Sequence, residues 1–337
     1  MAVKLATDRR GAPSLASEAE EPHMPFETTR LRLFSGNANR PLAQAICDYL
    51  GTELGDASIG QFSDGEVYVR INENIRGSDI FIFQPTFSPA TNLMELLIMV
   101  DAVRRASARR VTAVIPYFGY QRQDRKDAPR VPITAKLVAN LITTAGADRV
   151  MTMDLHSAQI QGFFDIPFDH LYAAPVLVEY FMHREVTNLI AVAPDIGSVK
   201  MARAYAKRLG VSLAIVDKRR PRPDAVETMN IIGDIDRKNV VIFDDIVSTA
   251  STLVEAAKAL KDAGARDIYA AVTHGVLCGD AIARIVDSPV KEIVITDSIP
   301  HPPGTLPSKI KVLSVAGLLG EAIRRIHAEE SLSSLFI

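Results

Sequence analysis

The sequence predicts an α/β protein built from doubly wound parallel sheets. From Leu31 onward, short apolar segments alternate with segments whose apolar residues recur at helical spacing. The apolar segments show no polar alternation, which is typical of parallel strands buried on both faces. Acidic residues and a histidine closely follow several of these segments, as ligand-binding side chains do at the carboxyl ends of parallel strands.

The predicted elements divide into two sets. Strands are expected at residues 31–34, 80–83, 111–115 and 150–153, and then at 189–193, 213–216, 240–243, 268–272 and 293–295. A helix is expected at 92–107, because Leu93, Leu97 and Val100 share one face. Glycines just past an apolar-periodic run predict three helix ends, at Gly146, Gly210 and Gly264.

A chain of 337 residues is expected to form two domains. We place the first at residues 30–170, joined by a C-terminal helix at 316–337, and the second at 171–315. Residues 1–29 are rich in Ala, Glu, Pro and Ser. They lack the apolar core of a signal peptide, and their acidic cluster does not suit a transit peptide. We therefore expect a disordered tail, with Met24 as an alternative start.

Composition excludes several classes of protein. The formal net charge of −2 argues against nucleic-acid binding by bulk electrostatics. No apolar run approaches the ~18 residues that a membrane span requires. Cys47 and Cys278 match no metal or redox spacing, which predicts a reducing, cytoplasmic compartment. Neither a P-loop nor a Gly-x-Gly-x-x-Gly fingerprint is present, so nucleotide chemistry requires another phosphate site.

Residues 239–252 are the most informative segment. The predicted strand 240–243 leads into Asp244 and Asp245, then small and hydroxyl residues, and then a helix with Leu253, Ala257 and Leu260 on one side. Such a turn directs backbone N–H groups and a positive helix end at one point, which favours a phosphate. Carboxylates beside a phosphate would bind the hydroxyls of a sugar, either directly or through a divalent cation. The alternative is a helix cap beside a solvated acidic pair.

Two further segments carry nucleotide-binding side chains. Asp64-Gly65 is a strong hairpin-turn signal, and a plain turn is one interpretation. The other is that Phe62 offers an aromatic face to a base. The segment from Tyr117 to Pro132 is dense in guanidinium groups, which bind phosphate bidentately. A solvated loop is the alternative there.

A basic run and a histidine complete the set. Four cations in residues 217–224 follow a predicted strand, where they would stabilise charge on a transferred phosphoryl group, although such a run is often only a solvated face. His156 and Asp195 each follow a strand. We expect them to converge across adjacent strand ends and to hold a divalent ion, although a lone histidine is more often structural.

In this order the segments resemble the ribose-phosphate pyrophosphokinases (phosphoribosyl diphosphate synthetases) of the phosphate-activated class I. The similarity covers residues 32–336 and includes segments 62–66, 92–101, 122–126, 154–156, 159–165 and 217–222. It implies the type I phosphoribosyltransferase fold in both domains. It also implies transfer of the β,γ-pyrophosphoryl group of MgATP to the 1-hydroxyl of ribose 5-phosphate. The products would be AMP and 5-phospho-α-D-ribose 1-diphosphate, for nucleotide, histidine and tryptophan biosynthesis.

Two alternatives keep the same fold. One is a non-catalytic, synthetase-associated regulatory subunit, against which the presence of Lys218, Arg220 and His156 argues. The other is a regulator that binds nucleic acid, which the absence of a basic excess disfavours.

The resemblance also implies roles for individual residues. Adenine would be bound across a subunit interface by Phe62, Asp64 and Glu66, and the rest of ATP by Arg122, Gln123, Asp127 and His156. Magnesium would be held by His156 and Asp195, and the catalytic residues would be Lys218 and Arg220, on a mobile loop. Ribose 5-phosphate would be bound by Asp244, Asp245, Ser248, Thr249, Ala250, Ser251 and Thr252.

Assembly and regulation are implied as well. The resemblance suggests a homo-oligomer in which dimers form a hexamer, with phosphate as activator and ADP as inhibitor. The chain ends on Leu335, Phe336 and Ile337, an apolar ending that is expected to dock. The allosteric residues are expected to be Ser331, Ser333 and Phe336, lying near Arg76 and Arg130.

The sequence departs from the family pattern at three serines. Ser248 replaces the third aspartate of the ribose-phosphate loop, Ser251 replaces its glycine, and Ser198 replaces the second glycine after Asp195. Backbone N–H donors remain at all three positions, so phosphate binding is expected to persist. Because Ser248 has no carboxylate, contacts to the ribose hydroxyls are expected to be lost there. Ser251 is expected to need a backbone conformation that glycine adopts more readily.

Overall fold

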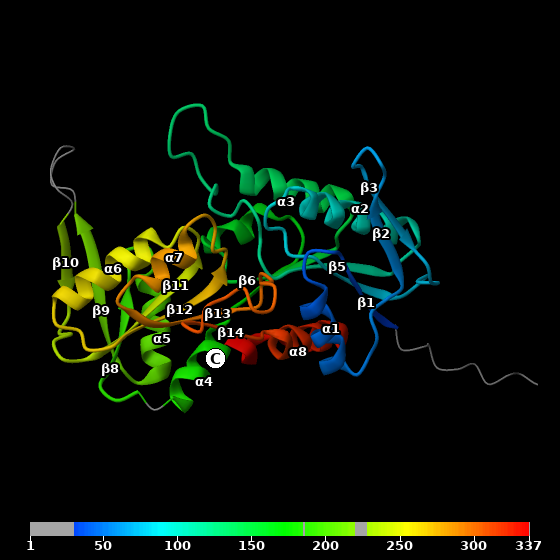
Figure 1. The fold of residues 1–337 in the computed structure, drawn as a ribbon. Helices are drawn as coiled ribbons and strands as arrows, with labels where there is room; N and C mark the ends of the chain where they lie inside the picture. The colour runs from blue at the N-terminus through cyan, green and yellow to red at the C-terminus, as the bar shows by residue number, and fades with distance from the viewer. Residues whose placement is uncertain (1–29, 185, 220–227, 337) are drawn as a thin grey trace, which may run out of the picture.

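A computed structural model describes residues 30–184, 186–219 and 228–336, and it contains two main sheets (Figure 1). The first has five parallel strands in the order β1-β4-β5-β6-β7. Its strands are β1 (Leu31–Ser35), β4 (Asp79–Phe83), β5 (Arg110–Ile115), β6 (Arg149–Met153) and β7 (Phe168–Leu171). A separate antiparallel hairpin consists of β2 (Ala57–Gln61) and β3 (Val67–Ile71).

The second sheet has seven strands in the order β10-β9-β8-β11-β12-β13-β14. It is parallel except for β10, which runs antiparallel to β9. Its strands are β8 (Leu189–Ala193), β9 (Ser212–Arg219), β10 (Thr228–Ile232), β11 (Asn239–Val247), β12 (Ile268–Gly275), β13 (Val290–Thr296) and β14 (Ile310–Leu313). The predicted class, α/β with two doubly wound parallel sheets, is confirmed.

Helices connect the strands. The first half contains α1 (Arg40–Leu50), α2 (Thr91–Arg105) and α3 (Thr134–Ala145), and a 3-10 helix at Ala158–Phe163. The second contains α4 (Ala174–His183), α5 (Val199–Leu209), α6 (Ser251–Asp262) and α7 (Ala281–Val286). The predicted ends of α3 and α5 are confirmed, because Gly146 and Gly210 cap them in the left-handed conformation. Gly264, also left-handed, lies just past α6.

The chain then returns to its first half. After β14, helix α8 (Ala316–His327) packs beside α1, where Tyr49 Oη donates to Glu321 Oε2 over 3.2 Å. The carbonyl of Ile326 accepts a hydrogen bond from Arg110 at the start of β5. A short 3-10 helix, Ser333–Phe336, follows.

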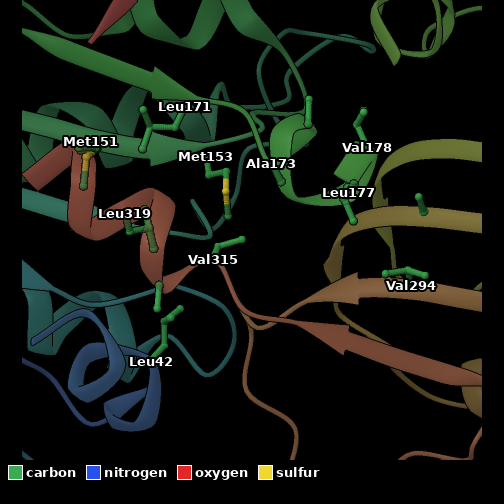
Figure 2. Close-up of a cluster of buried hydrophobic side chains, with 14 of the residues drawn as sticks. Leu42, Met151, Met153, Leu171, Ala173, Leu177, Val178, Val294, Val315 and Leu319 are labelled. Carbon is green, nitrogen blue, oxygen red and sulfur yellow. The ribbon is translucent and has the colours of Figure 1, made fainter. Parts of the chain in front are cut away.

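One buried hydrophobic cluster joins the two sheets (Figure 2). It contains Met151 and Met153 of β6, Leu177 of α4 and Val294 of β13. Two other clusters fill the remaining sheet faces, one under α2 and α3 and one under α6 and α7. Because a single cluster spans both sheets, the carboxyl ends of β6 and β12 meet. There Thr273 Oγ1 donates to Asp154 Oδ2 over 2.7 Å.

Several strands extend past their predicted boundaries, and in two of them this moves site residues onto a strand. Strand β11 does not end at Phe243 but continues to Val247, because β12 still pairs with it beyond the end of β8. Strand β9 continues to Arg219, because the antiparallel β10 pairs with its second half. Asp244, Asp245 and Lys218 therefore lie on strands rather than in loops.

Candidate functional site

The two halves of the chain meet at a histidine–carboxylate pair. His156 follows β6, and its Nδ1 lies 2.8 Å from Oδ2 of Asp245 on β11. Gln121 fixes the histidine from the other side, since its Oε1 accepts the backbone N–H of His156. The hydrogen bond to Asp245 raises the pKa of His156 against the opposing effect of burial. Burial alone would raise the pKa of Asp245, but the bond and charge of His156 outweigh it and lower that pKa.

A second carboxylate cluster lies beside this pair. Asp195 Oδ1 accepts both the backbone N–H and the hydroxyl of Ser198, over 2.8 and 2.9 Å. The same hydroxyl lies 3.2 Å from Oδ1 of Asp244. Burial, then the charges of Asp245 and Asp195, raise the pKa of Asp244 well above its usual range. The cluster therefore has more negative charge than its protein neighbours compensate.

Residues 248–252 lead into α6, which begins at Ser251. Ala250 adopts the left-handed conformation with φ of 61°, whereas Ser251 is the first residue of the helix and is not among the residues with positive φ. The expectation that Ser251 needs a glycine-like conformation was therefore wrong, since the chain turns one residue earlier. The hydroxyls of Thr249 and Ser251 lie 3.2 Å apart, and Arg284 Nη1 donates to Ser251. Hydroxyls, a helix N-terminus and a guanidinium group can together bind a phosphate.

The arginine-rich segment after β5 borders the same region. The charge of Arg122 lowers the pKa of both Tyr117 and His156. Larger effects, burial for Tyr117 and the hydrogen bond to Asp245 for His156, raise each pKa overall. Gln123 lies at the start of α3, where Thr134 donates to its side chain. Asp127 is exposed. The structure thus places Arg122 near Tyr117 and His156.

The β2–β3 hairpin lies at the opposite end of the molecule from β9 and β10 (Figure 1). The rings of Phe62 and Tyr68 pack on each other with centroids 5.1 Å apart, and Phe62 is 57% exposed. Asp64 accepts the backbone N–H of Glu66. Within one chain, therefore, Phe62, Asp64 and Glu66 do not reach the cluster around Asp244.

The predicted catalytic pair is only partly described. Lys218 lies in β9, with its Cα opposite that of Met229 in β10, but its side chain is outside the described residues. Arg220 lies outside them altogether. We expected His156 and Asp195 to follow adjacent strands. They do not, because β6 and β8 belong to different sheets. Asp244 and Asp245 of β11 lie between them.

The comparisons with known proteins agree with this geometry. Residues 31–146 match the family model of the N-terminal domain of ribose phosphate pyrophosphokinase, and residues 218–337 that of the phosphoribosyl synthetase-associated domain. The ribose-phosphate pyrophosphokinase of Caldanaerobacter subterraneus subsp. tengcongensis is 56% identical over 92% of this chain and 98% of its own length. That of Agrobacterium fabrum is 56% identical over 91% of this chain and its own full length. The chain belongs to the ribose-phosphate pyrophosphokinase family.

A solved structure extends the similarity to the fold of this pyrophosphokinase. The crystal structure of phosphoribosylpyrophosphate synthetase from Mycobacterium smegmatis has a TM-score of 0.84 and 38% identity, over 89% of this chain and all of the other. No helix in the described part of the pyrophosphokinase is long and apolar enough to cross a membrane.

The predicted allosteric residues of the pyrophosphokinase do not all come together. Ser331 and Ser333 hydrogen-bond to each other over 3.1 Å, and Ser333 lines a pocket of about 560 Å³. Arg110 and Arg149, the first residues of β5 and β6, line the same pocket. Arg130, by contrast, follows the carboxyl end of β5, at the opposite edge of that sheet.

The two other predicted members of this set are described only in part. Arg76 lies in the turn before β4 and is exposed. The side chain of Phe336 lies outside the described residues.

Sequence reasoning missed several neighbours of the site. Arg284 reaches Ser251 from α7, and the thiol of Cys278 lies 3.2 Å from the hydroxyl of Ser248. Gln121 lies in the segment from Tyr117 to Pro132, but no role of its own was predicted for it. Neither Arg284, on a short helix, nor Cys278, an isolated cysteine, belongs to a local sequence pattern that indicates a binding site. Ser198 did carry one, since it departs from the family pattern, and its contacts show why it matters.

Proposed function

We propose that this protein transfers the β,γ-pyrophosphoryl group of MgATP to the 1-hydroxyl of ribose 5-phosphate, giving 5-phospho-α-D-ribose 1-diphosphate and AMP. One observation carries the proposal beyond family membership. An acidic pair, Asp244 and Asp245, stands directly before the hydroxyl-lined start of α6 and opposite His156. The arrangement suits a phosphorylated sugar, with carboxylates for its hydroxyls and a helix N-terminus for its phosphate.

Each part of the site has a task in this reaction. Thr249, Ser251 and Thr252 bind the 5-phosphate, and the two aspartates orient the ribose so that its 1-hydroxyl faces the β-phosphorus. Arg122 binds ATP phosphates beside His156. Lys218 and Arg220 stabilise the charge that develops on the transferred group, an effect typically worth about 3 kcal/mol for one contact. Holding both reactants in position supplies much of the remaining rate enhancement.

Magnesium is the cofactor that this cluster fits. Asp195 and Asp244 are carboxylates, the ligands that Mg²⁺ prefers, and their negative charge is only partly compensated. Among the described residues no group of three or more His, Cys, Asp or Glu could hold a metal by itself. This suits Mg²⁺, which often binds through one or two carboxylates together with substrate phosphates. His156 and Asp195 would hold the ion, which when bound neutralises charge on the phosphates.

The test is AMP formation from ATP and magnesium, with and without ribose 5-phosphate. AMP should appear only when the sugar phosphate is present, in equal amount to phosphoribosyl diphosphate. AMP formation at the same rate without the sugar phosphate, or none with it, would refute the proposal. Lys218→Ala should lower turnover by about two to three orders of magnitude and change the Michaelis constants far less. A raised Michaelis constant for ATP at unchanged turnover would instead make Lys218 a binding residue.

The adenine site and the assembly belong to the same proposal. Because the β2–β3 hairpin lies at the opposite end of the molecule from β9 and β10 (Figure 1) and Phe62 is exposed, we propose that a neighbouring subunit supplies Phe62, Asp64 and Glu66 to each site. The oligomer would be built of dimers that form a hexamer, in the cytoplasm. An active monomer in sedimentation at assay concentration would contradict this arrangement.

Regulation by phosphate and ADP is proposed for the C-terminal pocket. Ser333 lines this pocket beside two arginines at the amino ends of β5 and β6, and Ser331 donates a hydrogen bond to Ser333. Any part played by Arg130 would have to come from another subunit. Removal of residues 331–337 should abolish activation by phosphate and leave the basal reaction in place. A truncated enzyme that still responds fully to phosphate would show that this segment only packs.

A further inference from the structure

The hydroxyl of Ser198 lies between two carboxylates that serve different ligands in the proposed function. Ser198 Oγ is 2.9 Å from Oδ1 of Asp195, the proposed magnesium ligand. It is also 3.2 Å from Oδ1 of Asp244, which belongs to the ribose 5-phosphate site. A glycine at this position, as in the family pattern, would leave no side-chain donor between the two acids.

The sheet explains why one hydroxyl reaches both. Strands β8 and β11 are parallel neighbours, with Val192 opposite Ile242. Asp195 follows β8, and Asp244 lies two residues beyond Ile242, so both carboxylates emerge at the same edge. Ser198 immediately precedes α5, and its backbone N–H also bonds to Asp195. The loop from β8 to α5 thus carries the hydroxyl back over the edge to β11.

The chemistry of this contact is asymmetric. A hydroxyl has one proton, so at any moment it donates to only one of the two carboxylates between which it lies. Both hydrogen bonds that Ser198 donates to Asp195 fall on Oδ1. Ser198 therefore does not occupy the other oxygen, Oδ2. The hydroxyl both orients Asp195 and moderates its repulsion with Asp244.

We propose that Ser198 is a positioning residue that couples the magnesium ligand Asp195 to the ribose 5-phosphate ligand Asp244. Without the hydroxyl, the two carboxylates repel each other more strongly, and Asp244 is less well placed for the sugar. A cation on Asp195 relieves the same repulsion. Loss of the hydroxyl therefore matters most when magnesium is scarce. This inference rests on the proposed function, since it assumes that both ligands bind there.

The test measures binding rather than turnover. Ribose 5-phosphate is titrated calorimetrically into protein that carries α,β-methylene-ATP, at limiting and at saturating magnesium. Ser198→Ala should weaken binding of the sugar phosphate about five-fold at limiting magnesium, the loss expected from one hydrogen bond. The defect should shrink to less than about two-fold when magnesium saturates. Ser198→Thr, which keeps the hydroxyl, should bind within about two-fold of the unaltered protein at both concentrations.

A matched control removes a hydroxyl elsewhere. Ser288 is buried after α7, where its hydroxyl donates to Ile285 O over 2.7 Å, and Ser288→Ala should leave binding of the sugar phosphate unchanged. Normal binding by Ser198→Ala at both magnesium concentrations would overturn the inference, and so would a defect that magnesium does not change. If the unaltered protein binds ribose 5-phosphate but forms no AMP, the proposed function is wrong. The role of Ser198 can still be tested in that case, because the test compares binding of ribose 5-phosphate and not turnover.

Discussion

Two adjacent carboxylates acquire opposite properties in this site. Asp244 and Asp245 are neighbours in β11, yet the pKa of the first is raised and that of the second is lowered. Alternation along the strand is the reason, since successive side chains point to opposite faces. Asp245 meets His156 from the first half of the chain, whereas Asp244 meets Asp195 and Ser198. Asp245 is thus paired with a histidine, whereas Asp244 can bind a cation or a sugar hydroxyl.

The pairing predicts how His156 titrates. Because the hydrogen bond and charge of Asp245 raise the pKa of His156, Asp245→Asn should lower it. NMR titration of the His156 ring proton would measure the shift. Asp124→Asn should lower the pKa less, because Asp124 is the weakest of the contributions that raise it. An unchanged or higher pKa in Asp245→Asn would show that the contact does not persist in solution.

At the scale of elements, the end of α8 holds the C-terminal segment in place. Ala328 caps the helix, and Glu329 follows in the left-handed conformation with φ of 57°. The N–H of Glu330 bonds to Arg325 O and that of Glu329 to Ile326 O, the two bonds of a Schellman motif. The turn directs residues 331–336 toward the pocket at the amino ends of β5 and β6. Most helices that end in this way use glycine, so an exposed glutamate here is strained.

Replacing that glutamate should therefore stabilise the protein. Glu329→Gly is expected to raise the free energy of unfolding by about 1 kcal/mol, because glycine adopts positive φ without steric cost. Urea unfolding would measure the change. Ala328→Gly is the matched control: Ala328 has φ of −79°, so glycine should lower stability there by adding entropy to the unfolded chain. Equal effects of the two substitutions would contradict the argument.

At the scale of the whole molecule, buried polar groups fasten the two halves together. His274 of β12 lies with Nε2 3.0 Å from Met153 O and with Nδ1 2.9 Å from the hydroxyl of Ser298. Since a carbonyl can only accept, Nε2 carries the proton of a neutral ring. A second buried histidine, His170 of β7, lies within the first half and accepts the N–H of Leu155. Burial lowers the pKa of each histidine to about 4.

These histidines predict acid instability. Their folded pKa lies below the ordinary 6.5, so between pH 6.5 and 4 the unfolded chain binds more protons, and stability falls as the pH falls. Asp154 acts oppositely, since burial raises its pKa to about 6 and the folded state gains a proton below that pH. The net difference should thus be about one proton from pH 6.5 to 5, so the decline should be nearly even there and shallower toward pH 4. The total should be on the order of 3 kcal/mol.

Urea unfolding at a series of pH values would measure this slope. His274→Gln should reduce it, because one of the two histidines is removed and the remaining one is largely balanced by Asp154. Stability that stays constant from pH 6.5 to 4, or that rises steadily on acidification, would show that these groups are not neutral in the folded protein.

The class of fold, several helix ends and the segments around the carboxylate cluster could be predicted from the sequence alone. Those features are local. Apolar runs such as Val240–Phe243 have only one way to be buried on both faces, and a glycine such as Gly146 past a helical run has one favoured conformation. The order of such segments also carried the family resemblance, which the relatives confirm. Shorter or more polar strands, such as β7 and β14, lacked this signal and were missed.

Which side chains meet could not be predicted from the sequence, because it depends on how distant segments pack. His156 and Asp245 are 89 residues apart, and they touch because one buried cluster joins two sheets. The lengths of β9 and β11 depended on the partners β10 and β12, which no local pattern reveals. Likewise, Arg130 and Ser333 lie at opposite edges of a sheet because strand direction, not distance along the chain, sets the edge. Contacts of this kind follow from packing between distant segments, so they appear only once the chain has folded.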